Sequence, residues 1–240
     1  MKIKLGELKK VVHDVIAEDA VKPSQAEQKG LALLRVNDGD EGHTYVLYDP
    51  AHAYDLFKNA ATGKGKSEIS PQLIASEDFI VAMINCTKPE HPSNDASEIH
   101  LAAAKKGYGP MMYDIVMGME GGLISDRHAV SKFARGVWAK YKNRNDVKAS
   151  LLDDYEDPKT KDPNDDATVF DGGKENPLNY SYTIARTPKA SELMSKHEDL
   201  IDAIEKFGYD RGQIETVLAV TATDYFRSKY ASQVVATNSF

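Results

Sequence analysis

Hydrophobic positions in the first half of the chain fall into short runs separated by polar, glycine-bearing segments. Residues 30–36 and 43–48 are rich in aliphatic and aromatic side chains and flank the polar turn 37–42, a combination that predicts a β-hairpin. The continuous apolar run 79–86 predicts a buried strand, and residues 97–104 predict a fourth strand. Four strands are therefore expected before the middle of the chain.

Apolar residues at helical spacing predict a different structure in most of the remaining chain. The expected helices cover residues 51–60, 111–119, 131–138, 190–207 and 210–230, and the last two form a helix hairpin. Residues 123–126 and 179–185 are further strand candidates. The predicted fold class is α+β, an α/β three-layer arrangement in which helices flank a central mixed, mostly antiparallel sheet.

Residues 1–20 predict an amphipathic helix of their own. Lysines lie off an aliphatic stripe made of Leu5, Leu8, Val12, Val15 and Ile16. Such a stripe must be covered, either by its own domain or by a neighbouring subunit. Because Lys22 and Pro23 break the chain after it, we favour a neighbouring subunit as the partner, and hence an oligomer or a larger assembly.

The chain divides into four parts by composition. An N-terminal helix and linker span residues 1–28, and a core spans residues 29–152. Residues 153–176 form an acidic loop, because the segment 153–166 has almost nothing to bury. A C-terminal strand and the helix hairpin span residues 177–240.

Composition excludes several classes of function. The chain has 240 residues, 41% of them hydrophobic, and a net charge of −7, which argues against non-specific binding of nucleic acid. No apolar run is long enough to cross a bilayer, so we expect no membrane partner. Cys86 is the single cysteine, which excludes an internal disulfide, and its apolar run predicts a buried filler. The histidines lack the spacing of metal ligands, so no metal site is expected.

The most informative segment is the turn that follows the fourth predicted strand. Lys105, Lys106, Gly107, Tyr108 and Gly109 lead through Pro110 into a predicted helix. Glycines let the backbone pass close beneath a ligand, and the amino end of a helix favours negative charge. A tight strand-to-helix connection without any ligand would need the same glycines. The turn therefore predicts either a pyrophosphate site or a plain connection.

The order of elements around this turn resembles that of a known superfamily. A strand, a Gly-x-Gly turn, a helix, a short strand and a second helix over residues 131–138 resemble the core of the GNAT-type N-acetyltransferases, across about residues 30–145. In that superfamily the turn reads Arg/Gln-x-x-Gly-x-Gly/Ala and holds the pyrophosphate of acetyl-CoA. The resemblance implies a GNAT-like fold, acetyl-CoA bound by the five residues 105–109, and acyl transfer from acyl-CoA to an amine.

Acetyl transfer to an amine needs a base and often an acid. Glu98 and His100 lie two residues apart on the strand before the turn, hence on one face, and are the candidate bases. Tyr141 carries a phenol that could act as the acid, and Tyr113 is a second such phenol. Each of these residues also has a plain structural alternative, as an exposed strand residue or as a helix–sheet contact.

Three departures from the superfamily pattern support an alternative function. Ala104 stands where the family has Arg or Gln, Pro110 removes a backbone donor, and Trp138 stands where the family has a Tyr. The alternative is a catalytically silent GNAT-like structural or assembly component. The opening Met1-Lys-Ile, followed by a short basic helix, resembles a recurring start of tailed-phage proteins and implies a place in a virion; otherwise a cytoplasmic location is expected.

Overall fold

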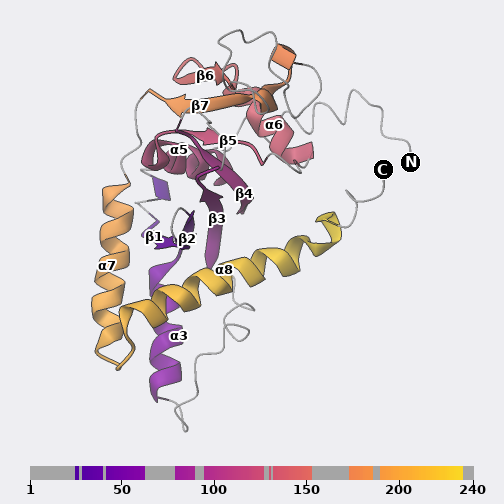
Figure 1. Ribbon diagram of the computed structural model, residues 1–240. Coiled ribbons are helices and arrows are strands. Elements are labelled where there is room, and N and C mark those ends of the chain that lie inside the picture. Colours follow the sequence, from indigo (N-terminus) through magenta and orange to yellow (C-terminus); the bar gives the residue numbers. More distant parts are fainter. Residues whose placement is uncertain are drawn as a thin grey trace.

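The computed structural model describes residues 25–26, 29–39, 42–62, 79–89, 95–126, 130, 132–152, 173–185 and 190–234. The predicted N-terminal helix and most of the predicted acidic loop lie outside these residues. Within them the chain forms one seven-stranded sheet and five α-helices, together with two short 3-10 helices. Figure 1 shows the sheet in the middle of the molecule with helices on both sides.

The first half of the sheet is an antiparallel meander. Strands β1 (Ala32–Asn37) and β2 (Gly42–Tyr48) pair as the predicted hairpin, and β3 (Ile80–Thr87) and β4 (Ser97–Ala104) add to it in turn. All four predicted strands are confirmed, with ends shifted by no more than a few residues. The hairpin follows from its polar turn between two apolar runs.

The second half of the sheet begins with a crossover. Helix α5 (Gly109–Glu120) carries the chain from β4 to β5 (Leu123–Ile124), which lies parallel to β4. Helix α6 (Lys132–Tyr141) leads on to β6 (Val147–Leu151), which pairs antiparallel with β7 (Tyr180–Ile184). The strand order is β1-β2-β3-β4-β5-β7-β6, and only the β4–β5 pair is parallel. The predicted mixed, mostly antiparallel sheet is therefore confirmed.

Helices cover both faces of the sheet, because successive residues of each strand point to opposite sides. Leu33 and Tyr45 pack with buried residues of α5 and α6, on what we call the α5 face. Their neighbours Leu34 and Val46 pack with α3 (Pro50–Thr62), α7 (Ser191–Glu205) and α8 (Arg211–Val234), on the α8 face. The result is a three-layer α+β fold. Cys86 is fully buried on the α5 face, as expected for a filler, and burial raises its pKa to about 12.

The predicted C-terminal helix hairpin packs on its own sheet. In Figure 1, α7 lies beside β1 and α8 crosses the sheet. The predicted apolar stripe of α7 is buried and consists of Leu193, Leu200, Ile201 and Ile204. The main apolar positions of α8 are buried too: Ile214, Leu218, Tyr225 and Phe226. Full burial of one such side chain stabilises a fold by about 1.5–3 kcal/mol, so the hairpin belongs to the core. Among the helices that the structure describes, none has the length and apolar character needed to span a bilayer.

Candidate functional site

Strands β4 and β5 separate almost as soon as they have paired. Their register contains only Ser97 opposite Leu123 and Glu98 opposite Ile124. From Ile99 to Ala104, β4 pairs with β3 alone within the described part of the chain. On the β5 side, the main-chain groups of this segment therefore have no strand partner among the described residues, although they lie inside the sheet. We call this segment, residues 99–104, the β4 opening.

His100 lies within the β4 opening at an irregularity of the strand. Asn85 of β3 faces Leu101 and the next residue, Cys86, faces Ile99, so His100 is an extra residue that forms a β-bulge. Its side chain is exposed, and its Nε2 lies 2.7 Å from Thr87 Oγ1. A bulge redirects a side chain, and here it holds an imidazole in solvent beside the opening.

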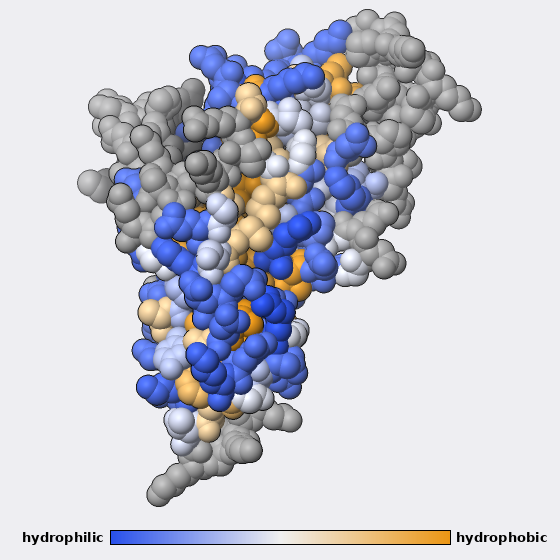
Figure 2. Space-filling model, turned by 90° about the vertical axis from the view of Figure 1, so that its left-hand side faces the viewer, coloured by the Kyte–Doolittle hydropathy of each residue, from blue (hydrophilic) through white to orange (hydrophobic). Residues whose placement is uncertain are grey.

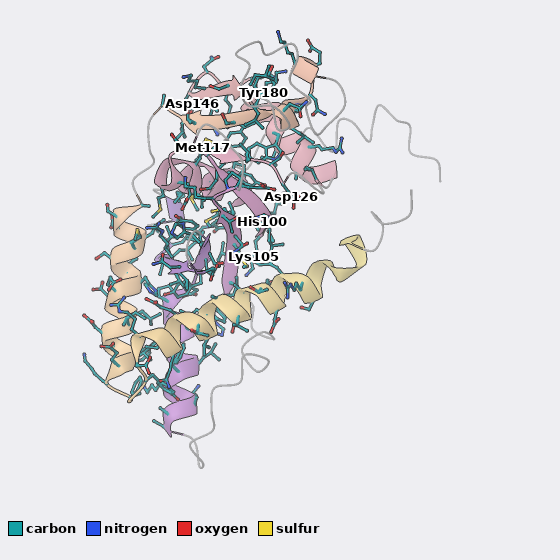
Figure 3. The ribbon with its side chains drawn as sticks, viewed as in Figure 1. His100, Lys105, Met117, Asp126, Asp146 and Tyr180 are labelled. Carbon is teal, nitrogen blue, oxygen red and sulfur yellow. The ribbon has the colours of Figure 1, made fainter. Side chains whose placement is uncertain are left out.

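Glu98 and His100, the two candidate bases, lie on the α8 face. Thr87 is the register partner of Glu98 and also hydrogen-bonds His100, which places both side chains on one side of β4. They differ in access, because Glu98 is buried and only 7% exposed. In Figure 3, His100 and Lys105 follow one another down the right-hand side of the sheet, and Asp126, just after β5, lies above them. Of the two candidate bases, His100 is the one that solvent and a ligand can reach.

The glycine turn lies where the β4 opening ends. Tyr108 N–H donates to the carbonyl of Lys105 over 3.1 Å, and Gly107 has φ +87°, in the left-handed region that favours glycine. Gly109 begins α5 without such strain, and a Cβ added there would meet Ala104 Cβ at an ordinary 4.0 Å. Only Gly107 is therefore required by the backbone conformation.

Three lysines surround this turn. Lys105 and Lys106 belong to it, and Lys29 reaches it from the segment before β1, donating from Nζ to the Tyr108 hydroxyl over 2.9 Å. The cations lie beside the amino end of α5, whose first N–H groups have no partner within the helix. Lys29 could not be found from the sequence, since 79 positions separate it from Tyr108.

The predicted acid, Tyr141, is held in a hydrogen-bond network. Its hydroxyl donates to Asp114 Oδ1 at 2.5 Å and also lies 3.0 Å from the carbonyl of Pro110. Burial, together with the Asp114 carboxylate, raises the pKa of Tyr141 far above its ordinary value. Arg144 binds both oxygens of Asp114 and lies 4.8 Å from the Tyr141 ring centre. This network fixes the first turns of α5.

Trp138 and Tyr113 are packed in the core of the α5 face. Trp138 is only 1% exposed and stacks on Tyr182 with ring centres 5.1 Å apart, and Tyr113 meets it edge-on at 5.5 Å. Burial raises the pKa of the Tyr113 phenol. Neither side chain points into solvent beside the β4 opening.

A second polar cluster surrounds Glu120 at the other end of α5. Its carboxylate accepts hydrogen bonds from Tyr45 and Ser97, and it lies 2.9 Å from His43 Nδ1 and 4.0 Å from Arg35. Burial raises the pKa of Glu120, but these hydrogen bonds and the nearby positive charge outweigh burial and lower the pKa overall. In the sequence, this cluster was indicated only by an acidic residue at the end of a predicted apolar helix.

Metal ligands do not gather anywhere in the described residues, where no group of three His, Cys, Asp or Glu side chains is arranged to hold an ion. Comparison of the chain with protein-family models, with curated proteins and with solved structures gave no match. The candidate site therefore rests on the geometry of the β4 opening, the glycine turn and the three lysines.

Proposed function

We propose that the protein binds an acyl-CoA at the β4 opening and transfers the acyl group to an amine. The observation that carries the proposal is the edge of β4 that has no strand partner among the described residues and that runs directly into the glycine turn and the amino end of α5. A free strand edge binds extended, amide-bearing ligands through main-chain hydrogen bonds. A phosphate group at the end of such a ligand would meet the helix end and the cations of Lys29, Lys105 and Lys106.

The GNAT-like character of the site is part of this proposal. The described chain has a strand, a glycine turn, a helix, a parallel strand and a second helix in that order, which is what the resemblance implies. Lys29 offers a cation beside the turn, where Ala104 offers none. Pro110 still lacks an N–H group, so the proposed cradle has one donor fewer than the family pattern.

His100 is the proposed general base. With Nε2–H donated to Thr87 Oγ1, Nδ1 keeps the lone pair that removes a proton from the attacking amine. The bound acyl-CoA supplies the acyl group as an activated thioester. A carbon–nitrogen bond forms as the carbon–sulfur bond breaks, and the departing thiolate takes its proton from solvent, because the Tyr141 phenol is held by Asp114.

A catalytically silent GNAT-like assembly component is the second candidate. It is favoured by the packing of Trp138 and Tyr141 into the core and by the burial of Glu98, which leave His100 as the one candidate catalytic side chain that is exposed. In this case the fold supplies surfaces, and the amphipathic helix of residues 1–20, outside the described residues, would contact a neighbouring subunit in a virion.

Calorimetry with acetyl-CoA separates the two candidates. The contacts missing at Ala104 and Pro110 are each worth about 1.5–3 kcal/mol, so we expect saturable binding weaker than micromolar. Lys29→Gln and Lys105→Gln should each weaken it further by roughly fivefold to tenfold, whereas His100→Gln should leave it unchanged and slow transfer to an amine by about a hundredfold or more. No heat of binding at millimolar acetyl-CoA, with folded protein, would leave only the assembly role.

A further inference from the structure

A histidine lies in the core of the α8 face. His197 of α7 is only 4% exposed and continues the apolar stripe of that helix, four residues after Leu193 and three before Leu200. Figure 2 shows that most of the described surface on the side of the molecule where α7 lies is hydrophilic. The imidazole of His197 is directed toward the sheet, because it is buried and lies within hydrogen-bond distance of Tyr48 on β2. Its partners come from two further elements, β2 and α8.

Tyr48 of β2 is the hydrogen-bond partner of this imidazole. Its hydroxyl lies 2.7 Å from His197 Nδ1, and the two rings meet edge-on. Tyr48 is fully buried, and no other described residue accepts a hydrogen bond from its hydroxyl. Donation of the O–H to Nδ1 gives this hydroxyl its acceptor, and the ring is then neutral with its proton on Nε2, a buried atom that has no hydrogen-bond partner among the described residues.

The other charged groups that face His197 form a chain along the helix hairpin. Glu215 Oε1 of α8 lies 3.6 Å from Nε2, beyond hydrogen-bond length. Arg211, also of α8, binds Glu215 at 3.3 Å and Glu198 of α7 at 2.5 Å. The carboxylates are thus already paired with a guanidinium, and they compensate a charge on His197 only in part.

Protonation of His197 would break this arrangement. A proton on Nδ1 would have to be donated to the Tyr48 oxygen, and the Tyr48 O–H would then be a buried donor without an acceptor. Burial lowers the pKa of His197 more strongly than Glu215 and Glu198 raise it. Both the hydrogen bonding and the desolvation therefore favour the neutral ring in the packed state.

We propose that His197 is an acid-sensitive latch that holds the α7–α8 hairpin against the sheet and loosens it when protonated. The hairpin covers the apolar side chains of the α8 face, among them Leu34, Val46 and Met83. Burying one leucine stabilises the packed state by about as much free energy as a pKa shift of one to two units. The hairpin buries several such side chains, so the uptake of one proton shifts the opening equilibrium without making the open state the major one. The inference does not depend on acyl-CoA binding.

Hydrogen exchange followed by mass spectrometry at pH 7.5 and 5.5, corrected for intrinsic exchange rates, tests the latch. The latch predicts that the opening constant of α7 and α8 rises below about pH 6.5, by at most about tenfold per pH unit because one proton is taken up. Peptides of α5 should keep their protection. An equal loss of protection in α5 would show global unfolding and would overturn the proposal.

Two substitutions should act in opposite directions. His197→Gln keeps an acceptor for Tyr48 but cannot take up a proton, so the acid-induced opening should disappear. Glu215→Gln removes the carboxylate that partly compensates the imidazolium. The opening constant of α7 and α8 should therefore rise more between pH 7.5 and 5.5 than it does in the parent. His52→Gln, an exposed histidine on α3, is the matched control and should behave like the parent.

The result for either variant can overturn the proposed role of His197. If His197→Gln opens with acid as the parent does, another group is responsible. If His197→Gln does not fold, Glu215→Gln alone decides, since an unchanged or shallower pH dependence contradicts a buried histidine as the titrating group.

Discussion

Ser97, the first residue of β4, donates a hydrogen bond of 2.7 Å to Glu120, the last residue of α5. Tyr45 of β2 donates to the other oxygen of the same carboxylate. These hydrogen bonds join the start of β4 and the neighbouring strand β2 to the end of α5, at the end of the strand–turn–helix unit opposite the glycine turn. The geometry of the candidate site therefore depends on a carboxylate that lies outside it.

Glu120→Gln should destabilise the fold by about 2–3 kcal/mol, because charged hydrogen bonds are lost in a buried site. Urea denaturation of the variant, with the exposed Glu205→Gln of α7 as the matched control, measures the difference in free energy of unfolding. Equal midpoints for the two variants would contradict this role of Glu120.

The same carboxylate predicts a pH dependence. The pKa of Glu120 is lowered in the folded state, so its stabilisation is complete above the ordinary value of 4.5 and is lost as pH falls below it. The parent should therefore lose stability more steeply than Glu120→Gln does as pH falls below about 4.5.

Residues around Glu120 show why the sequence revealed the turn but not this cluster. The glycine turn is local, so adjacent glycines and lysines signalled it. Arg35, His43, Tyr45 and Ser97 come from three different strands, and only the sheet register brings them to one helix end. No spacing along the chain carries that information. His197 differs, because its place within an apolar helical stripe was a usable signal of burial.

The fold was predictable wherever apolar runs were long. Strands β1 to β4 and the five helices follow from their hydrophobic patterns. Strand β6 was missed because Val147–Leu151 is a short edge strand in which Lys148 is exposed and only Val147 is buried. Its position is set by pairing with β7, a long-range contact that local propensity does not encode.

Gly107 and Gly109 should respond differently to the same substitution. Gly107→Ala should cost about 1–2 kcal/mol of stability, because φ is +87° at that position. Gly109→Ala should be nearly neutral, since its added Cβ meets only Ala104 at 4.0 Å. Thermal denaturation compares the two, and equal melting temperatures would show that the turn tolerates a side chain at either glycine.

Tyr141→Phe should cost stability without removing a catalytic group. The variant loses the hydrogen bond to Asp114, together with the hydroxyl contact with the carbonyl of Pro110, and should be less stable by about 1–2 kcal/mol. Tyr180→Phe, which removes a more exposed hydroxyl bonded to the carbonyl of Lys174, is the control and should cost less. If acyl transfer is observed, Tyr141→Phe should keep it within about threefold; a hundredfold loss would make Tyr141 the acid after all.

Deletion of residues 1–20 tests whether the predicted amphipathic helix acts between molecules. Both large clusters of buried side chains lie within the described residues, and the first described residues include Ala26, which is fully buried. The truncated chain should therefore unfold cooperatively, with a melting temperature close to that of the parent. Light scattering should show that the full-length chain associates and that the truncated chain is a monomer. A short helix needs a surface to fold against, and burying each of its aliphatic residues is worth about 1.5–3 kcal/mol. If the truncated chain aggregates or melts without cooperativity, that surface is the protein's own core and the helix has no role in assembly.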